Sequence, residues 1–327
     1  MNLPLAIITL AAGLILLWKC ADLLVSGAVA LAQRLGMSPL IIGLTVVAMG
    51  TSAPEVAASV AAVLDGPGGG DTAVGNICGS NIANLALVGG VITLMRPLLI
   101  QRTIMLRELP VMLVTGLIMG HSLRDGNVSR MEALLLLAVF FSLVAGAIYA
   151  ARQKSISSVG DLAIPAAADV DNSLGKAFLL IFAGLVGLTV GARMAILGAT
   201  YVGKLVGMSN AVIGLTIVAI GTSLPELITC VVAALKGHHD ISIGNLVGSN
   251  IFNTLLVTGT AGLIRPFSVG ERFSGGIDYW VMMAVSLGFT AMAWAWRGRL
   301  SRLGGGILLG TYVAYMAYLL IFTLGSA

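Results

Sequence analysis

Charged residues are scarce in this sequence. Only 10% of its 327 residues are Asp, Glu, Lys or Arg, while 58% are hydrophobic, and an ordinary soluble domain carries about 25% charged residues. This scarcity excludes a water-soluble fold, and the long apolar runs predict an all-α integral membrane protein. The sequence also lacks basic patches interleaved with aromatic residues, so the expected surroundings are membrane lipid and no nucleic acid.

Cysteine is nearly as rare, and none of the three cysteines forms a CxxC pair: Cys20, Cys78 and Cys230. We interpret them as small buried residues rather than as a disulfide framework. The N-terminal run MNLPLAIITLAAGLILLW lacks a basic region and a small-residue cleavage site. It therefore predicts a retained first span rather than a signal peptide.

Apolar segments predict ten transmembrane helices. They fall near residues 3–33, 38–64, 71–95, 104–122, 131–150, 174–205, 209–235, 240–264, 277–296 and 304–324. The polar stretch 151–173 contains Pro165 and divides the chain into a first half, 1–150, and a second half, 174–327. It is too short for a folded regulatory domain, so we interpret it as a linker.

The two halves are internal repeats of one another. Residues 36–64 align with 207–235 at 17 identities in 29 positions, and 71–97 align with 240–266 at 14 identities in 27. Each half has about five spans, and because five is odd the second half enters the membrane inverted relative to the first. Inverted repeats with helix breaks near the midplane are typical of secondary transporters.

The distribution of Lys and Arg predicts the orientation of the chain. With the N-terminus outside, inner loops carry eleven basic residues and outer loops carry five. Cytoplasmic loops are the ones enriched in Lys and Arg. Both termini are therefore expected outside, and the linker 151–173 is expected in the cytoplasm.

A proline and a glutamate interrupt the second span of each half. GLTVVAMGTSAPE, 43–55, recurs as GLTIVAIGTSLPE, 214–226. Proline removes a backbone donor, and the carbonyls that it frees are tolerated inside a membrane where they face a cavity or bind something. A lone carboxylate there costs at least about 2.5–3.5 kcal/mol. One copy could be an ordinary kink beside a structural glutamate, but two copies favour function. The hydroxyls of Thr51 and Thr222 lie one turn before Glu55 and Glu226 on the same helix face.

A second repeated motif adds polar oxygen atoms. GNICGSNIAN recurs as GNLVGSNIFN and places Ser80 with Asn84, and Ser249 with Asn253, on one helix face. In each motif a glycine, Gly79 or Gly248, is expected to allow close helix packing. Hard cations such as Ca²⁺ and Na⁺ prefer oxygen ligands, whereas soft metals prefer Cys or His. All three histidines fall at predicted span ends or loops: His121, His238 and His239. Zinc and copper are therefore disfavoured.

Two buried glutamates without a basic residue in either motif form a site of charge −2. One Ca²⁺, two monovalent cations or protons would neutralise it, which favours antiport. The basic residues well inside the spans are Lys19 and Arg193. We expect Lys19 to pair with Asp22, three residues further along the helix. Asp22 aligns with Arg193 across the repeat, so the halves are not equivalent there.

On these two duplicated motifs the chain resembles the cation/calcium exchanger superfamily, and within it the compact bacterial sodium/calcium exchangers. The resemblance extends over nearly the whole chain. It implies ten helices in two inverted five-helix repeats, a bacterial inner membrane location, and ion sites between the second, third, seventh and eighth spans. It also implies a set of twelve ion ligands. In the first half they are the Ala48 carbonyl, Thr51, Ser52, Glu55, Ser80 and Asn84; in the second they are the Ala219 carbonyl, Thr222, Ser223, Glu226, Ser249 and Asn253.

The resemblance and the residues together predict a Na⁺/Ca²⁺ antiporter that works by alternating access, with no cofactor and no obligatory protein partner. Some family members carry Asp where Asn253 stands, so potassium cotransport is not expected here. Proton/calcium antiport is the main alternative, since buried glutamates can also titrate. A passive cation channel is a second alternative. An enzyme is not expected, because no His or Lys accompanies the glutamates in sequence and no Ser–base pair is apparent.

Overall fold

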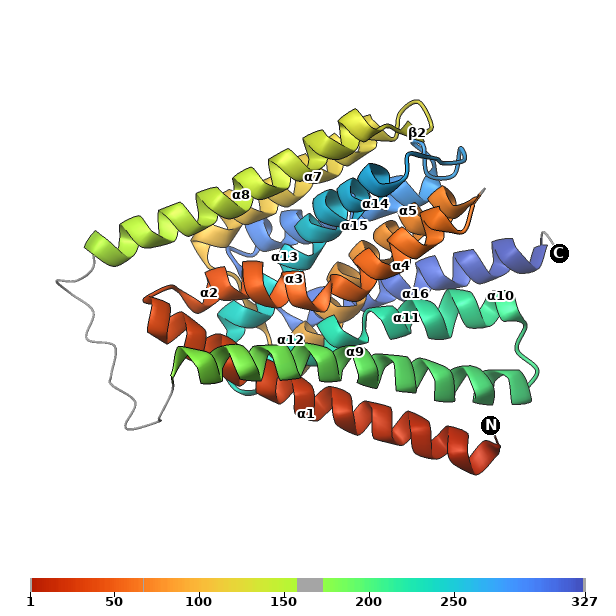
Figure 1. The fold of residues 1–327 in the computed structure, drawn as a ribbon, viewed down its shortest axis with the longest axis horizontal. Helices are drawn as coiled ribbons and strands as arrows, with labels where there is room; N and C mark the ends of the chain where they lie inside the picture. The colour runs from red at the N-terminus through yellow and green to blue at the C-terminus, as the bar shows by residue number, and fades with distance from the viewer. Residues whose placement is uncertain (1, 67, 158–172, 326–327) are drawn as a thin grey trace.

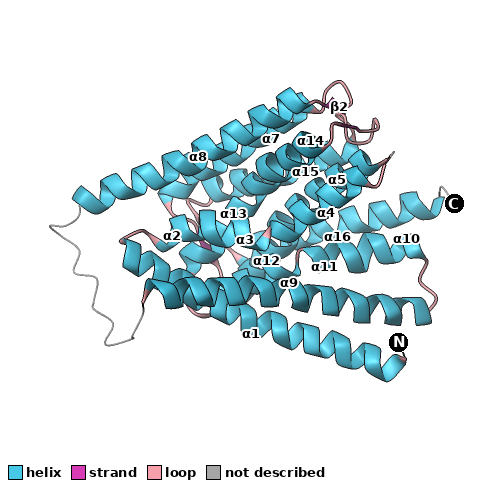
Figure 2. Cartoon of the chain, viewed as in Figure 1, coloured by secondary structure: helices cyan, strands magenta, loops and turns pink. Residues whose placement is uncertain are grey.

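The computed structural model describes residues 2–66, 68–157 and 173–325. Nearly all of them are helical, and four two-residue strands complete the fold (Figure 2). Within the described residues, nine helices are long and apolar enough to cross a membrane, and one bent helix pair makes a tenth. The fold class predicted from the sequence is therefore confirmed.

The helices, with π-helical segments labelled η, follow the same order in both halves except for η3, which has no counterpart in the second. The first half contains α1 (Leu3–Leu35), α2 (Pro39–Ile42), η1 (Gly43–Val47), α3 (Ala48–Thr51), α4 (Ala53–Leu64), α5 (Gly69–Ile82), η2 (Ala83–Val88), α6 (Gly89–Met95), η3 (Ile104–Glu108), α7 (Leu109–Ser122) and α8 (Arg130–Ser157). The second contains α9 (Leu174–Leu205), α10 (Asn210–Ile213), η4 (Gly214–Val218), α11 (Ala219–Thr222), α12 (Leu224–Leu235), α13 (His239–Phe252), η5 (Asn253–Val257), α14 (Thr258–Ile264), α15 (Ile277–Ala295) and α16 (Arg302–Gly325).

The predicted spans agree with these bounds to within a few residues, except at the end of the fifth. α8 continues to Ser157 and so takes in the start of the predicted linker. The sequence ARQKSIS there is rich in Ala, Arg, Gln and Lys, which are good helix formers even when polar. The rest of the linker, 158–172, lies outside the described residues.

Two short antiparallel ribbons join the halves. β1 (Leu98–Leu99) pairs with β4 (Arg299–Leu300), and β2 (Asn127–Val128) pairs with β3 (Phe267–Ser268). Each ribbon takes one strand from each half, so the inverted repeats are linked in the same way twice.

α1 and α9 lie side by side along one edge of the molecule (Figure 1). Glycine allows this contact, since a Cβ added at Gly13 would lie 2.7 Å from the Gly191 carbonyl oxygen. The outer surfaces of the pair expose large apolar side chains such as Ile15 and Phe182. Apolar side chains that face outward are what a lipid environment requires. Both termini lie at one end of the helices, and α8 and α9 approach the linker at the other end (Figure 1). We call these ends the termini face and the linker face.

Candidate ion-binding site

The two Pro–Glu motifs break their spans at a serine. Ser52 (φ −84°, ψ 1°) separates α3 from α4, and Ser223 (φ −89°, ψ 4°) separates α11 from α12. At the second break the two helical parts are bent by 51°. The prolines then occupy the beginning of the following helix, where a missing N–H costs little. Glu55 and Glu226 follow in the first turn, where the helix dipole favours a negative charge.

Four π-helical segments surround these breaks. η1 and η4 lead into the Pro–Glu motifs, η2 contains Asn84, and η5 begins at Asn253. Each π turn widens the backbone spiral and leaves carbonyl groups without their usual partners, which is why such turns concentrate at functional sites. They were not predicted from the sequence, although each of them lies within or overlaps one of the two repeated motifs.

The two glutamates are held by hydroxyls from other helices. Ser52 donates to Glu226 Oε1 across the two halves, and Ser80 donates to Glu55 Oε1, both at 3.5 Å. Both carboxylates are only 1% exposed. None of the ion pairs among the described residues involves either of them. The site therefore concentrates negative charge without basic compensation.

Several of the buried polar atoms here have no hydrogen-bond partner within the protein. They include the second carboxylate oxygen of Glu55 and of Glu226, both amide atoms of Asn84 and of Asn253, and the Ser223 hydroxyl. A buried polar atom without a partner costs about 1–3 kcal/mol, and a charged one more. Groups so placed are expected to coordinate a ligand, and an all-oxygen set fits a hard cation.

Of the twelve ligand positions predicted above, ten are buried, and Ala219 and Thr222 are half-buried. Thr51 donates to the Ala48 carbonyl at 3.4 Å, and Thr222 donates to the Ala219 carbonyl at 3.1 Å. These hydroxyls thus sit against the carbonyls that the resemblance implicates. The two halves share these local contacts, but the second is more accessible.

Asn245 was not among the predicted site residues; it lies at the first polar position of the GNLVGSNIFN motif. Its Oδ1 accepts from Thr51 at 3.1 Å and from Ser249 at 3.5 Å, and its amide nitrogen contacts Cys230 Sγ at 3.3 Å. Asn245 therefore connects both halves beneath the site. Its equivalent, Asn76, donates to the Glu55 carbonyl and to a neighbouring serine. The repeated Gly-Asn dipeptide was the available signal.

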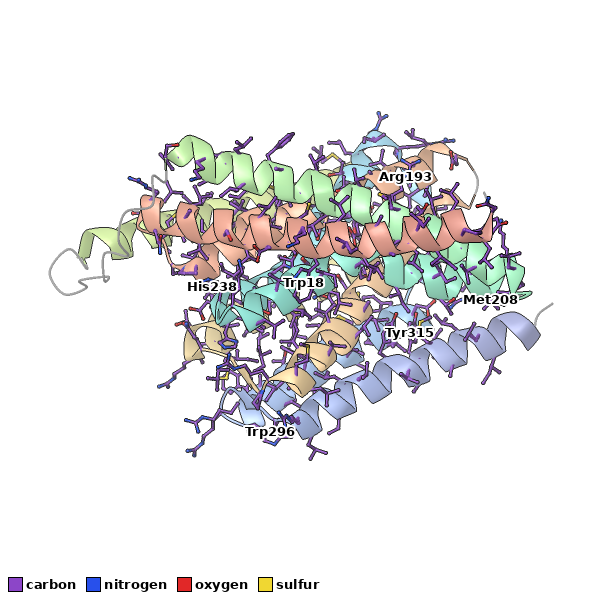
Figure 3. All side chains as sticks on the ribbon, turned by 90° about the horizontal axis from the view of Figure 1, so that it is seen from below. Trp18, Arg193, Met208, His238, Trp296 and Tyr315 are labelled. Atoms are coloured by element: carbon purple, nitrogen blue, oxygen red, sulfur yellow. The ribbon has the colours of Figure 1, made fainter. Side chains whose placement is uncertain are left out.

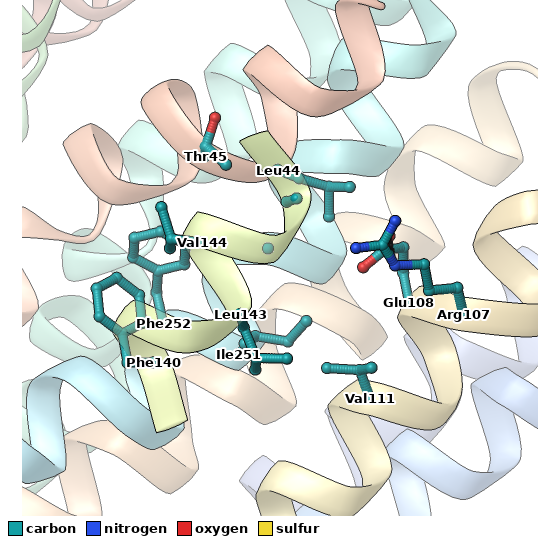
Figure 4. Close-up of a pocket in the computed structure, with 12 residues that line it drawn as sticks. Leu44, Thr45, Arg107, Glu108, Val111, Phe140, Leu143, Val144, Ile251 and Phe252 are labelled. Carbon is teal, nitrogen blue, oxygen red and sulfur yellow. Dashed lines mark ion pairs between the residues drawn. The ribbon is translucent and has the colours of Figure 1, made fainter. Parts of the chain in front are cut away.

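Two cavities related by the repeat reach this region, and they differ in size. One, of about 370 Å³, opens beside α5, α11 and α16, and its lining includes Ala219 and Thr222. The other, of about 50 Å³, lies beside η1, α8 and α13 (Figure 4). An offset of 172 residues relates Phe140, Leu143, Val144 and Ala147 in the small cavity to Tyr312, Tyr315, Met316 and Leu319 in the large one. The larger cavity, on the side of the termini face, reaches Ala219 and Thr222, whereas none of the twelve predicted ligand positions lines the smaller one, on the side of the linker face; we call them the open and the closed cavity.

Two glycines at equivalent positions of the repeat, Gly79 and Gly248, differ in packing in the same way as the two cavities differ in size. A Cβ at Gly248 would lie 2.8 Å from the Leu44 carbonyl oxygen, so α13 packs directly against η1 on the closed side. A Cβ at Gly79 would have no atom within 4 Å. The expectation of close packing therefore holds for Gly248 and is wrong for Gly79, because Gly79 lines the open cavity.

The expected pairing of Lys19 with Asp22 is also wrong. Asp22 forms its ion pair with Lys236, which also donates to Ser26. α1 packs against α12, so a tertiary partner replaces the local one. Arg193 lies on the exposed side of α9, away from the site (Figure 3).

Comparison with known proteins identifies several similar sequences and folds. The profile of a family described as sodium/calcium exchanger protein matches residues 5–149 and 176–321. The inner membrane protein YrbG of Escherichia coli is 38% identical over 317 residues, covering 96% of this chain and 97% of that protein. The sodium/calcium exchanger MaX1 of Methanosarcina acetivorans is 32% identical, covering 94% and 96%. The structure of the sodium/calcium exchanger from Methanococcus jannaschii superposes with a TM-score of 0.80 at 26% identity, covering 97% and 99%.

Proposed function

Because this chain belongs to the sodium/calcium exchanger protein family, we propose that it exchanges Ca²⁺ for Na⁺ across the membrane by alternating access. The family consists of membrane transporters, so the chain is a multi-pass transporter and not an enzyme. Cation/calcium antiport follows from the family, and the proposal adds the coupling ion and the residues that bind it.

The observation that carries the proposal is the pair of buried carboxylates without basic partners. Glu55 and Glu226 come from opposite repeats, and the contact from Ser52 to Glu226 brings the two motifs together. Each keeps one oxygen with no partner in the protein. Two carboxylates match the charge of one Ca²⁺ or of two Na⁺, so the same groups can bind either ion in turn.

Neutral oxygen atoms would complete the coordination. Ca²⁺ takes six to eight oxygen ligands, and two carboxylates alone cannot supply that number. The orphaned amide oxygens of Asn84 and Asn253, the Ser223 hydroxyl and the Thr51 and Thr222 hydroxyls add the rest. Ca²⁺ would use this set whichever ion it is exchanged for. Na⁺ can bind the same neutral oxygen atoms in turn, whereas a proton needs none of them, and on this ground we propose Na⁺ as the counter-ion.

The unequal cavities support alternating access between the two faces. The open cavity gives ions from the termini face a route to Thr222. We propose that the repeats 1–150 and 174–327 exchange these roles, so that the small cavity beside η1 opens when the large one closes, while the linker 151–173 joins them. In the proposed orientation the protein lies in the bacterial inner membrane with both termini outside. Ca²⁺ and Na⁺ are then its required partners.

A flux measurement tests this proposal. Purified protein is reconstituted into liposomes loaded with Na⁺, K⁺ or choline at matched pH, and uptake of external ⁴⁵Ca²⁺ is followed. A parallel set carries an imposed pH gradient, and the Glu226→Gln protein is the control for the site. We expect uptake that needs internal Na⁺ and that falls to background in Glu226→Gln.

The other outcomes contradict the proposal in different ways. Uptake that ignores Na⁺ but follows the pH gradient would replace Na⁺ with H⁺ and keep the site. Uptake that needs no counter-ion would indicate a passive channel. Uptake that survives in Glu226→Gln with its Na⁺ dependence intact would remove the glutamates from the mechanism.

A further inference from the structure

Each of the two cavities has one arginine and one acid as its charged lining residues. In the open cavity they are Arg272 and Asp278, and in the closed cavity they are Arg107 and Glu108. The two acids occupy equivalent places, since each lies near the start of the fourth span of its half. None of these four residues belongs to the ion-binding motifs.

Asp278 is the more firmly held of the two acids. It is 2% exposed, and it pairs with the Arg272 Nε and Nη2 atoms. Tyr315 donates to Asp278 Oδ1 at 2.8 Å from the inward side of α16 (Figure 3). Arg272 has a partly exposed side chain, at 36%, and stands in the loop before α15. The pair thus holds a guanidinium against the cavity wall.

The closed cavity has a simpler pair. Arg107 Nε lies 3.5 Å from Glu108 Oε1, and the rest of the lining is mostly apolar, including Phe140 and Phe252 (Figure 4). Leu143 stands where the open cavity has Tyr315, so the phenol that contacts Asp278 has no counterpart at that position. The same combination of charges therefore occurs at both faces in different local settings.

An unbalanced arginine in such a cavity would oppose a divalent cation. Clefts with low-dielectric walls focus the field of a lining charge and change local ion concentrations and on-rates by about 10–10³-fold. Asp278 cancels the Arg272 charge at the place where a cation passes toward Thr222. The Asp278 carboxylate without its arginine would have the opposite effect, since it would attract the cation and compete with Glu55 and Glu226 for it.

We infer that Asp278 is a positioning residue for ion access from the termini face: it holds and neutralises Arg272 so that the open cavity conducts cations to the site. Glu108 does the same with Arg107 at the linker face. This inference rests on the proposed antiport, and it adds residues that set the apparent Ca²⁺ affinity separately at each face.

The test uses charge variants that should act in opposite directions. Asp278→Asn removes the buried carboxylate that pairs with Arg272 and makes the cavity lining more positive by one charge, so we expect the apparent KM for Ca²⁺ at the termini face to rise by about 10-fold or more. Arg272→Gln leaves the carboxylate and should lower this KM. The double variant should return close to the wild-type value, and Tyr315→Phe, which keeps both charges, should change it little.

Sidedness provides the matched control. Membrane vesicles of both orientations present Ca²⁺ to either face, and Na⁺-driven exchange is measured in each. Asp278→Asn should leave the KM at the linker face unchanged, and Glu108→Gln should alter that face alone. Elution as a monodisperse peak in detergent checks that each variant is folded.

A purely structural role predicts another pattern. Breaking a helix-bracing ion pair would impair exchange in both single variants, at both faces, and would not be repaired in the double variant. That pattern, or unchanged KM values in well-folded single variants, would overturn the inference while leaving the proposed antiport intact. Wild-type protein without coupled exchange would overturn both.

Discussion

The packing of Gly248 gives the sharpest prediction about how the transporter changes state. On the closed side, a Cβ at this position would meet the Leu44 carbonyl oxygen and the Ala48 Cβ, each at 2.8 Å. Both distances are shorter than the van der Waals contact distance of the atoms concerned. Gly248→Ala should therefore destabilise the arrangement in which α13 packs against η1.

The magnitude follows from the cost of overpacking. Inserting a methyl group into a well-packed contact typically costs about 1–3 kcal/mol, which corresponds to a shift of about 5–150-fold in a two-state equilibrium. Alanine also strengthens the helix relative to glycine, but this gain is the same in both states and cancels. We expect Gly248→Ala to favour opening toward the linker face by such a factor.

Gly79→Ala should have the opposite effect. No atom lies within 4 Å of its Cβ position in the observed state, so the substitution costs nothing there. If the repeats exchange roles, Gly79 must pack as Gly248 does now, and the added methyl group penalises that second state. Gly288→Ala is the matched control, because its Cβ also has no atom within 4 Å and Gly288 lines neither cavity.

Thiol accessibility measures the equilibrium. One reporter cysteine replaces Val144 in the closed cavity and another replaces its equivalent, Met316, in the open one; both positions are half-buried, while the native cysteines are buried. Modification by a membrane-impermeant reagent should become faster at Val144→Cys and slower at Met316→Cys in Gly248→Ala. Gly79→Ala should shift both rates the other way. Equal effects in the two glycine variants, or none, would refute the exchange of packing roles.

Three further predictions concern single residues. Glu226→Gln removes one of the two charges that would balance the ion, at a cost like that of breaking a buried ion pair, about 3–5 kcal/mol, so ⁴⁵Ca²⁺ exchange should fall by at least about 100-fold; coupled exchange above about 1% of the wild-type rate would contradict this. Asn245→Ala removes the acceptor of the Thr51 hydroxyl and should lower the free energy of unfolding by about 1–3 kcal/mol. We expect a lower Tm in detergent; an unchanged Tm would argue against the bridging role of Asn245. Lys236→Met breaks the ion pair with Asp22, in which both side chains are more than a third exposed. The free energy of unfolding should therefore fall by less than about 1 kcal/mol. A fall several times larger would show that this pair is essential for joining α1 to α12.

The predictable part of the fold came from composition and repetition. Ten apolar segments and an odd number of spans per repeat are enough to predict an inverted-repeat membrane protein, because the bilayer requires helices of a fixed length. The repeated Pro–Glu and Ser–Asn motifs in turn predict an oxygen-lined cation site. They do so because polar and charged side chains inside a membrane carry a free-energy cost, and the same costly residues occur at equivalent positions of both repeats.

Other features depend on contacts between distant segments, and local spacing does not determine those contacts. Asp22 has Lys19 close in sequence, yet it pairs with Lys236 because α1 packs against α12. Asn245 becomes a bridge to Thr51 only when the halves come together. The π-helical segments also depend on the folded chain, because tertiary packing can offset the free-energy cost of their strained backbone.

The sequence by itself determined the class of protein, its repeat and the chemistry of its site, since these follow from the solvent and from residue types. The tertiary structure decided which half is open. Gly79 and Gly248 are equivalent in sequence, as are the cavities beside α5 and α13, so no pattern along the chain can distinguish them. Their difference arises from packing between distant segments, because α13 lies directly against η1 at Gly248 while Gly79 borders the larger cavity.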